Sequence, residues 1–164
     1  MTEGRYVMGL ERAYRGEVFG EAVYAMAARL TRDPDRRRKW KALAQLETLT
    51  KTRLSKTLAL AGVSVREHAA RRWLGAAAGL LVGALPWRFT MALLGVITRS
   101  STPFFERLDS QSAECGGSHV GGLGAHERAQ SQFVRRELAG DEEHSLDDVL
   151  ALLRGGDMDS GANT

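Results

Sequence analysis

Four glutamates are candidates for inward-facing carboxylates, one in each of four expected helices. They are Glu17, Glu47, Glu106 and Glu127, and Glu106 is the weakest of them because several of its neighbours are polar. Glu47 is the clearest case, because at about 100° per residue it falls between Leu43 and Leu54 on one apolar stripe. A carboxylate on the buried face of a helix costs several kcal/mol unless it is paired or bound to a metal. The sequence therefore predicts either an ion pair, for which Lys51 is placed one turn later, or a metal site.

The spacing of these glutamates predicts that they meet in pairs. Asp33 is a suitable N-cap and Pro34 a suitable first helical residue, so the first turn is expected near residue 33. Glu17 and Glu47 lie at similar distances on either side of it, and at about 1.5 Å per residue their depths differ by only ~3 Å. Glu106 and Glu127 are equidistant from a second turn, expected near 116–117. Two carboxylates at one level repel each other unless a cation or a proton lies between them.

The elements that position these residues are expected to be helices only, because prolines are few and no run alternates apolar and polar residues. The first helix is expected to end at Leu30 and the second near Gly62. Thr102 and Pro103 are expected to cap and begin a new helix. The expected helices cover about 8–30, 34–61, 66–84, 86–99, 102–114 and 120–139, and a short amphipathic helix follows up to Arg154. We expect one domain over residues 1–154 and a disordered tail over 155–164.

Residues 73–98 form an apolar segment in which Arg88 is the one charged side chain. Its length would suffice to span a bilayer, but several glycines and Pro86 interrupt it. Three interpretations stay open: a buried crossover packed on the bundle, an interfacial membrane surface with its arginines at the headgroups, or a transmembrane span.

Composition narrows the class of protein. The net charge of +3 is not the profile of a dedicated nucleic-acid binder, and we expect no nucleic-acid partner. The single cysteine, Cys115, indicates a reducing compartment, and the N-terminus lacks the apolar core of a signal peptide. We therefore expect a cytoplasmic protein, placed peripherally on the inner face of a membrane if residues 66–99 contact lipid.

Three features of the sequence form one pattern. They are the paired glutamates, the long connection between the two hairpins, and Gly16-Glu17 followed by Tyr24. This pattern resembles the ferritin-like superfamily of di-iron carboxylate proteins, and its first helix is similar to that of rubrerythrins and of the demethoxyubiquinone hydroxylases, which are peripheral membrane enzymes. The resemblance covers roughly residues 9–139. It implies a four-helix bundle with a long crossover, in which Glu17 and Glu106 are terminal ligands and Glu47 and Glu127 bridge two iron ions, with manganese as the alternative.

The sequence departs from the superfamily pattern at two positions. Where that pattern has a histidine three residues after the second-helix and fourth-helix glutamates, this chain has Thr50 and Gln130. The loss of both imidazoles removes ligands that favour iron over harder cations. Gln130, His126 and Glu21 are the remaining candidates. His126 points about 100° away from Glu127, so we expect it to lie beside the site unless a rotation of the helix brings it in as a ligand.

Two classes of function follow. In the first, the chain is a di-metal oxidase or hydroxylase, in which Tyr24 supplies a hydrogen bond or radical path and residues 73–98 guide a lipophilic substrate. In the second, it is a metal-free ferritin-like scaffold for binding or assembly at a membrane or protein partner. A homo-oligomer and a peripheral membrane contact through 66–99 are compatible with both.

Overall fold

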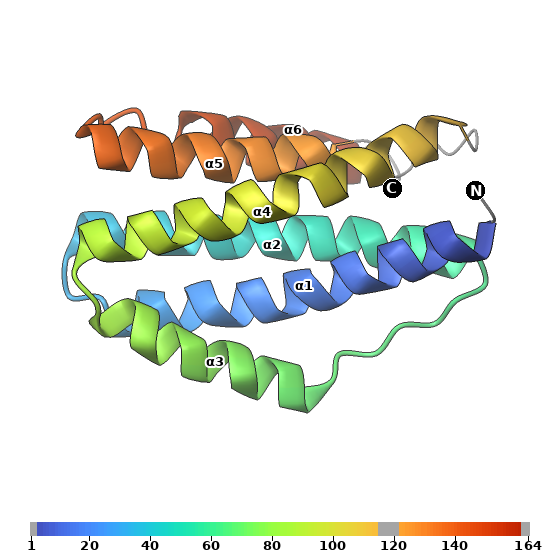
Figure 1. Cartoon of the computed structure of the whole chain (residues 1–164), viewed down its shortest axis with the longest axis horizontal. Helices are drawn as coiled ribbons and strands as arrows, with labels where there is room; N and C mark the ends of the chain where they lie inside the picture. The colour runs from blue at the N-terminus through green and yellow to red at the C-terminus, as the bar shows by residue number, and fades with distance from the viewer. Residues whose placement is uncertain (1–2, 115–121, 162–164) are drawn as a thin grey trace.

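The computed structural model describes residues 3–114 and 122–161, and these residues form α-helices without a strand (Figure 1). The all-α prediction is therefore confirmed for this part of the chain. Cys115 and the turn expected near 116–117 lie outside the described residues. The helices are α1 (Glu3–Leu30), α2 (Pro34–Leu60), α3 (Ala69–Ala84), α4 (Trp87–Glu114), α5 (Leu123–Ala139) and α6 (Asp147–Gly161).

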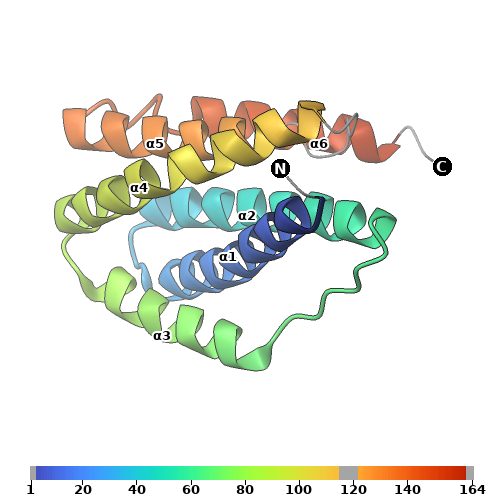
Figure 2. The same ribbon diagram turned by 45° about the vertical axis from the view of Figure 1, so that its right-hand side comes forward.

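Four of these helices form a closed ring of contacts. The helices α1 and α2 pack as one hairpin, and α4 and α5 pack as a second. The ring closes because α1 also contacts α4 and α2 also contacts α5. The helix α3 lies on the outer side of α1, whereas α6 packs against both α2 and α5 (Figures 1 and 2). The interior of the ring is the place where side chains from α1, α2, α4 and α5 can meet.

The first hairpin forms as the sequence predicts. Asp33 caps α2 by accepting a hydrogen bond from the backbone N–H of Arg36 at 2.9 Å, and Pro34 occupies the first helical position. The helix ends at Leu60, and Gly62 follows with a φ of 75°, a left-handed conformation that favours glycine.

The helix α4 corrects the prediction that Thr102 and Pro103 begin a new helix, because α4 runs without interruption through Pro103. Proline removes one backbone hydrogen bond, and the hydroxyl groups before it bond to nearby carbonyls. Thr102 Oγ1 donates to the Thr98 carbonyl at 2.7 Å, and Ser101 Oγ lies 3.0 Å from the same oxygen. The crossover is therefore shorter than predicted, and the third helix of the ring begins at Trp87.

A buried charged group connects the start of α4 to its neighbours. Lys39 of α2 is fully buried and lies 2.7 Å from Glu137 Oε1 of α5 and 2.8 Å from Asp35 Oδ2. Trp87 Nε1 donates a hydrogen bond of 2.6 Å to the other oxygen of Glu137. Because α2, α4 and α5 each contribute one member, this group fixes the relative positions of three helices at one end of the ring.

The C-terminal helix is longer than predicted. It was expected to stop at Arg154 and to be followed by a disordered tail, but α6 continues to Gly161. Residues 162–164 lie outside the described part of the chain. Within the described ranges, no helix has the length and apolar character needed to cross a bilayer.

Candidate metal centre

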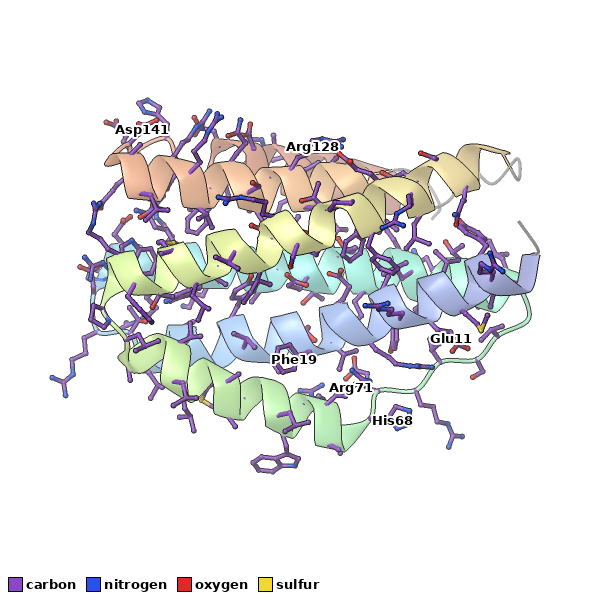
Figure 3. All side chains as sticks on the ribbon, in the orientation of Figure 1. Glu11, Phe19, His68, Arg71, Arg128 and Asp141 are labelled. Carbon is purple, nitrogen blue, oxygen red and sulfur yellow. The ribbon has the colours of Figure 1, made fainter. Side chains whose placement is uncertain are left out.

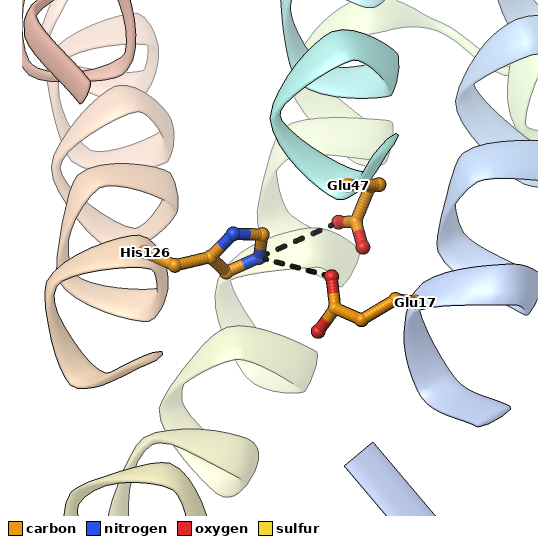
Figure 4. Close-up of side chains that lie close together, drawn as sticks. All are labelled: Glu17, Glu47 and His126. Carbon is orange, nitrogen blue, oxygen red and sulfur yellow. Dashed lines mark ion pairs between the residues drawn. The ribbon is translucent and has the colours of Figure 1, made fainter. Parts of the chain in front are cut away.

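Three side chains that can ligate a metal converge inside the ring. They are Glu17 of α1, Glu47 of α2 and His126 of α5 (Figure 4). One ligand atom from each lies within 4.8 Å of the others. His126 Nε2 is 3.7 Å from Glu17 Oε2 and 3.7 Å from Glu47 Oε1. All three residues are at least nine-tenths buried, with relative exposures of 2, 5 and 3%.

The hydrogen bonds around His126 define which ring nitrogen carries the lone pair that a metal ion could use. Thr50 Oγ1 lies 2.8 Å from Nδ1, and the side-chain nitrogen of Gln130 lies 2.9 Å from Nε2. An amide nitrogen can only donate, so Nε2 is the acceptor and Nδ1 carries the proton, which it donates to Thr50. The lone pair of Nε2 therefore faces the two carboxylates. Holding one ring nitrogen so that the other can ligate is the usual arrangement of histidine at metal sites.

Gln130 also organises Glu47. Its side-chain nitrogen donates to Glu47 Oε1 at 2.6 Å, and its oxygen accepts from the Tyr24 hydroxyl at 3.3 Å. The pKa of Tyr24 is raised well above its ordinary value by burial, and by the nearby charges of Glu47, Glu127 and Glu17. Tyr24 therefore stays a protonated donor, which keeps the amide of Gln130 oriented with its nitrogen toward Glu47.

The two carboxyl groups of the cluster are electrostatically unequal. Burial, the charge of Glu47 and a hydrogen bond with it raise the pKa of Glu17 well above its ordinary value. Burial opposes ionisation of Glu47 too, but the interactions with His126, Glu17 and Gln130 outweigh it and lower the pKa of Glu47. Of the two groups, Glu17 therefore keeps its proton to a higher pH than Glu47 does. Glu17 Oε2 is nevertheless buried without a hydrogen-bond partner.

Gly20 provides the space that Glu47 occupies. A Cβ atom at this position of α1 would lie 2.8 Å from Glu47 Oε2 and 2.9 Å from its Cδ. Glycine inside a helix is unfavourable by about 1 kcal/mol relative to alanine. The close approach of the Glu47 carboxylate explains why a residue without a side chain occupies this position of the helix.

Glu127 lies at the edge of the cluster rather than in it. It is buried, with 6% exposure, and accepts a hydrogen bond of 2.7 Å from Ser101 of α4. Burial raises its pKa, although the Ser101 hydrogen bond and the proximity of His126 act in the opposite direction. Glu127 is thus a buried acid next to the three ligand candidates, with a partner of its own.

Two predicted ligands lie outside the cluster. Glu106 is exposed on α4 and lies 3.5 Å from Arg128 Nη1 on the outer side of α5 (Figure 3). Glu21 accepts from Thr48 at 2.6 Å and lies 2.6 Å from Lys51 Nζ. The continuous course of α4 through Pro103 sets the register that turns Glu106 outward, so the prediction of an inward-facing Glu106 is wrong.

The predicted ion pair of Glu47 with Lys51 is also absent. Lys51 Nζ lies 2.6 Å from Glu21 and 2.6 Å from Glu67, both at the surface. Lys51 is on the margin of α2 that faces solvent, whereas Glu47 faces the interior of the ring.

The structure places His126 in the cluster, as expected for a rotated helix, and not beside the site. His126, Gln130, Phe133 and Glu137 are all buried along one face of α5. This helix packs against α4 on one side and against α2 and α6 on others, so two adjacent stripes are buried rather than one. The spacing of 126, 130, 133 and 137 was a signal in the sequence that could have identified the second stripe.

The described cluster could hold a metal ion. Two carboxyl groups and an imidazole with an available lone pair form a donor set that divalent cations accept. The partnerless oxygen of Glu17 fits such an ion, because a buried carboxylate oxygen otherwise lacks a counter-charge. Comparison of the chain with protein families, with curated proteins and with solved structures found no match.

Proposed function

We propose that this protein binds one divalent metal ion per chain through Glu17, Glu47 and His126. The observation that carries the proposal is the orphaned oxygen of Glu17, which is buried without a hydrogen bond and faces His126 Nε2. A cation there would compete with the protonation of Glu17 and would replace the amide contact at Nε2. Thr50 already holds the ring in the required tautomer.

Iron(II) or manganese(II) is the ion that we propose. Two oxygen donors and one nitrogen donor suit these ions, and zinc accepts the same set. The two-iron centre that the ferritin-like resemblance implies stays a prediction. A second ion would need Glu127 to exchange its hydrogen bond from Ser101 for a metal bond, and Glu106 lies too far out on the surface to contribute.

If the bound ion is catalytic, we propose that the protein is an oxidase or hydroxylase that acts on a lipophilic substrate. A bound iron ion would supply one-electron redox chemistry. Tyr24 would act through the residues present: its phenol donates to Gln130, which donates to Glu47, so a proton donor lies two hydrogen bonds from the ligand. The alternative is the metal-free scaffold, in which the hydrogen bonds of Gln130 alone satisfy Glu47.

Anaerobic titration of purified, chelator-treated protein with Fe(II), Mn(II) and Zn(II), followed by metal analysis after desalting, tests the proposal. We expect about one retained ion per chain and loss of retention in Glu47→Gln and in His126→Gln. Glu106→Gln is the matched control, because Glu106 is a predicted ligand that lies on the surface. The thermal unfolding midpoint of each variant shows whether it folds. Absence of retained metal in the folded wild-type protein would leave the scaffold.

A further inference from the structure

The outer surface of α3 and of the first half of α4 is apolar. Of the thirteen large hydrophobic side chains exposed in the described part of the chain, nine lie here, so the exposure is concentrated rather than scattered. We call these nine the α3–α4 apolar face. They are Trp73, Leu74, Leu80, Leu81, Leu85, Phe89, Leu93, Val96 and Ile97. Trp73 and Leu81 are the most exposed of them, at 76% and 70%.

The helix α3 packs with its small residues inward and its large apolar residues outward. A Cβ atom at Gly75 would lie 2.5 Å from the Phe19 carbonyl oxygen of α1, and one at Gly79 would lie 2.4 Å from that of Val23. This contact admits only glycine, so α3 approaches α1 closely. An amphipathic helix facing water places its large apolar residues against the core. Small residues at the helix contact and large apolar residues outside are typical of helices in contact with lipid.

The charged side chains within residues 68–105 are all basic. The sequence has no aspartate or glutamate between Glu67 and Glu106, and it has exposed arginines at 71, 88 and 99. His68 and Arg71 lie where the chain enters α3 (Figure 3). This distribution is complementary to an anionic surface.

Further basic residues extend the charge at one end of the face. The α1–α2 turn lies at the same end of the molecule as the α3–α4 turn (Figures 1 and 2), and the guanidinium of Arg36 lies 5.3 Å from the Trp87 ring centroid. Exposed basic side chains of this turn and the start of α2 are Arg29, Arg32, Arg37, Arg38 and Lys41.

We propose that the α3–α4 apolar face docks this protein on the surface of a membrane that contains anionic lipids. The helix α3 has 16 residues and is about 24 Å long, which is shorter than the ~30 Å hydrocarbon core, so it lies along the surface with its apolar side in the lipid. A second copy of the chain fits less well, because a two-fold pairing of this face would bring its arginines together.

Vesicle flotation tests the proposal with the full chain. We expect the protein to float with vesicles of phosphatidylcholine and phosphatidylglycerol in equal parts, and to be released by high salt. The substitutions Trp73→Ser and Leu81→Ser together should lower the partition coefficient by about 100-fold. Met8→Ser and Leu60→Ser together are the matched control, because these exposed side chains, at 64% and 70%, lie away from the face. His126→Gln should float like the wild type, so failure of metal binding does not affect this test.

Trp73 gives a second readout that is specific for the face. Trp40 and Trp87 are 1% and 9% exposed, so phosphatidylglycerol with brominated acyl chains should quench the fluorescence of Trp73 alone. Trp73→Phe should still float but lose the quenching. Equal flotation of the Trp73/Leu81 double variant, or equal flotation with pure phosphatidylcholine, would overturn the proposal. A third outcome would also overturn the proposal. In it, the wild-type protein does not float and is a dimer, and the Trp73/Leu81 double substitution makes it a monomer.

Discussion

Replacement of Gly20 by alanine should separate the stability of the fold from the affinity of the metal site. Gly20 lies on α1 opposite Glu47, and the added methyl would lie about 0.6 Å closer to Glu47 Oε2 than the 3.4 Å at which ordinary contact begins. The carboxylate is the end of a flexible side chain, so it can move. Such a movement takes it away from the position in which Gln130 and His126 hold it.

The two consequences of this change have opposite signs. Alanine is favoured over glycine inside a helix by about 1 kcal/mol, so the metal-free protein should lose little stability or gain a fraction of that amount. Changes that disturb the orientation of a ligand typically lower metal affinity by about 10- to 100-fold. We therefore expect an unfolding midpoint near that of the wild type and a dissociation constant for Fe(II) or Mn(II) raised by that factor.

Gly16→Ala is the matched control, because it lies one turn earlier on α1 and a Cβ atom there meets nothing within 4 Å. It should gain helix stability and keep the wild-type metal affinity. Isothermal titration calorimetry measures the affinity, and urea unfolding of the metal-free protein measures the stability. If Gly20→Ala bound metal as tightly as Gly16→Ala, the assignment of Glu47 as a ligand held in its observed position would be refuted.

Three further predictions concern the buried acid, the buried lysine and the proline of α4. The pKa of Glu17 is raised above its ordinary value of 4.5, so its contribution to the stability of the metal-free protein is complete below that value and is lost as pH rises through the folded-state pKa. Metal binding needs the carboxylate form of Glu17, so it should release a proton and become tighter as pH rises. Calorimetry in two buffers of different ionisation enthalpy measures this proton release, and Glu17→Gln should remove it. Lys39→Met leaves Glu137 buried without its cation and should lower the free energy of unfolding by about 3–5 kcal/mol, measured in urea. Adding Glu137→Gln should restore much of this loss. Equal stability of the single and double variants would contradict the pairing. Pro103→Ala should raise the free energy of unfolding by about 1–3 kcal/mol, because α4 is already continuous there, and a loss of stability would instead favour a helix boundary at this position.

The sequence predicted the elements whose signals are local. Asp33 and Pro34 determine where α2 begins, and Gly62 marks its end, because capping and left-handed geometry depend on single residues. The inward position of Glu17 and Glu47 followed from helical periodicity and from the length of one short turn. These inferences needed no knowledge of how distant helices pack.

The errors came from contacts that periodicity does not describe. Pro103 was expected to start a helix because proline is favoured there, but α4 continues through it. The resulting register turns Glu106 to solvent. His126 was expected beside the site because one buried stripe was assumed for α5, whereas its packing on several helices buries two.

The two residues that depart from the superfamily pattern explain how one histidine can serve the site. Thr50 and Gln130 stand where that pattern has histidines, and they contact the two ring nitrogens of His126, at 2.8 Å and 2.9 Å. Gln130 additionally donates a hydrogen bond to Glu47 at 2.6 Å. The two side chains that stand in place of two nitrogen ligands therefore orient the third candidate, and the cluster of Glu17, Glu47 and His126 is smaller than the four-carboxylate, two-ion centre that the ferritin-like resemblance implies.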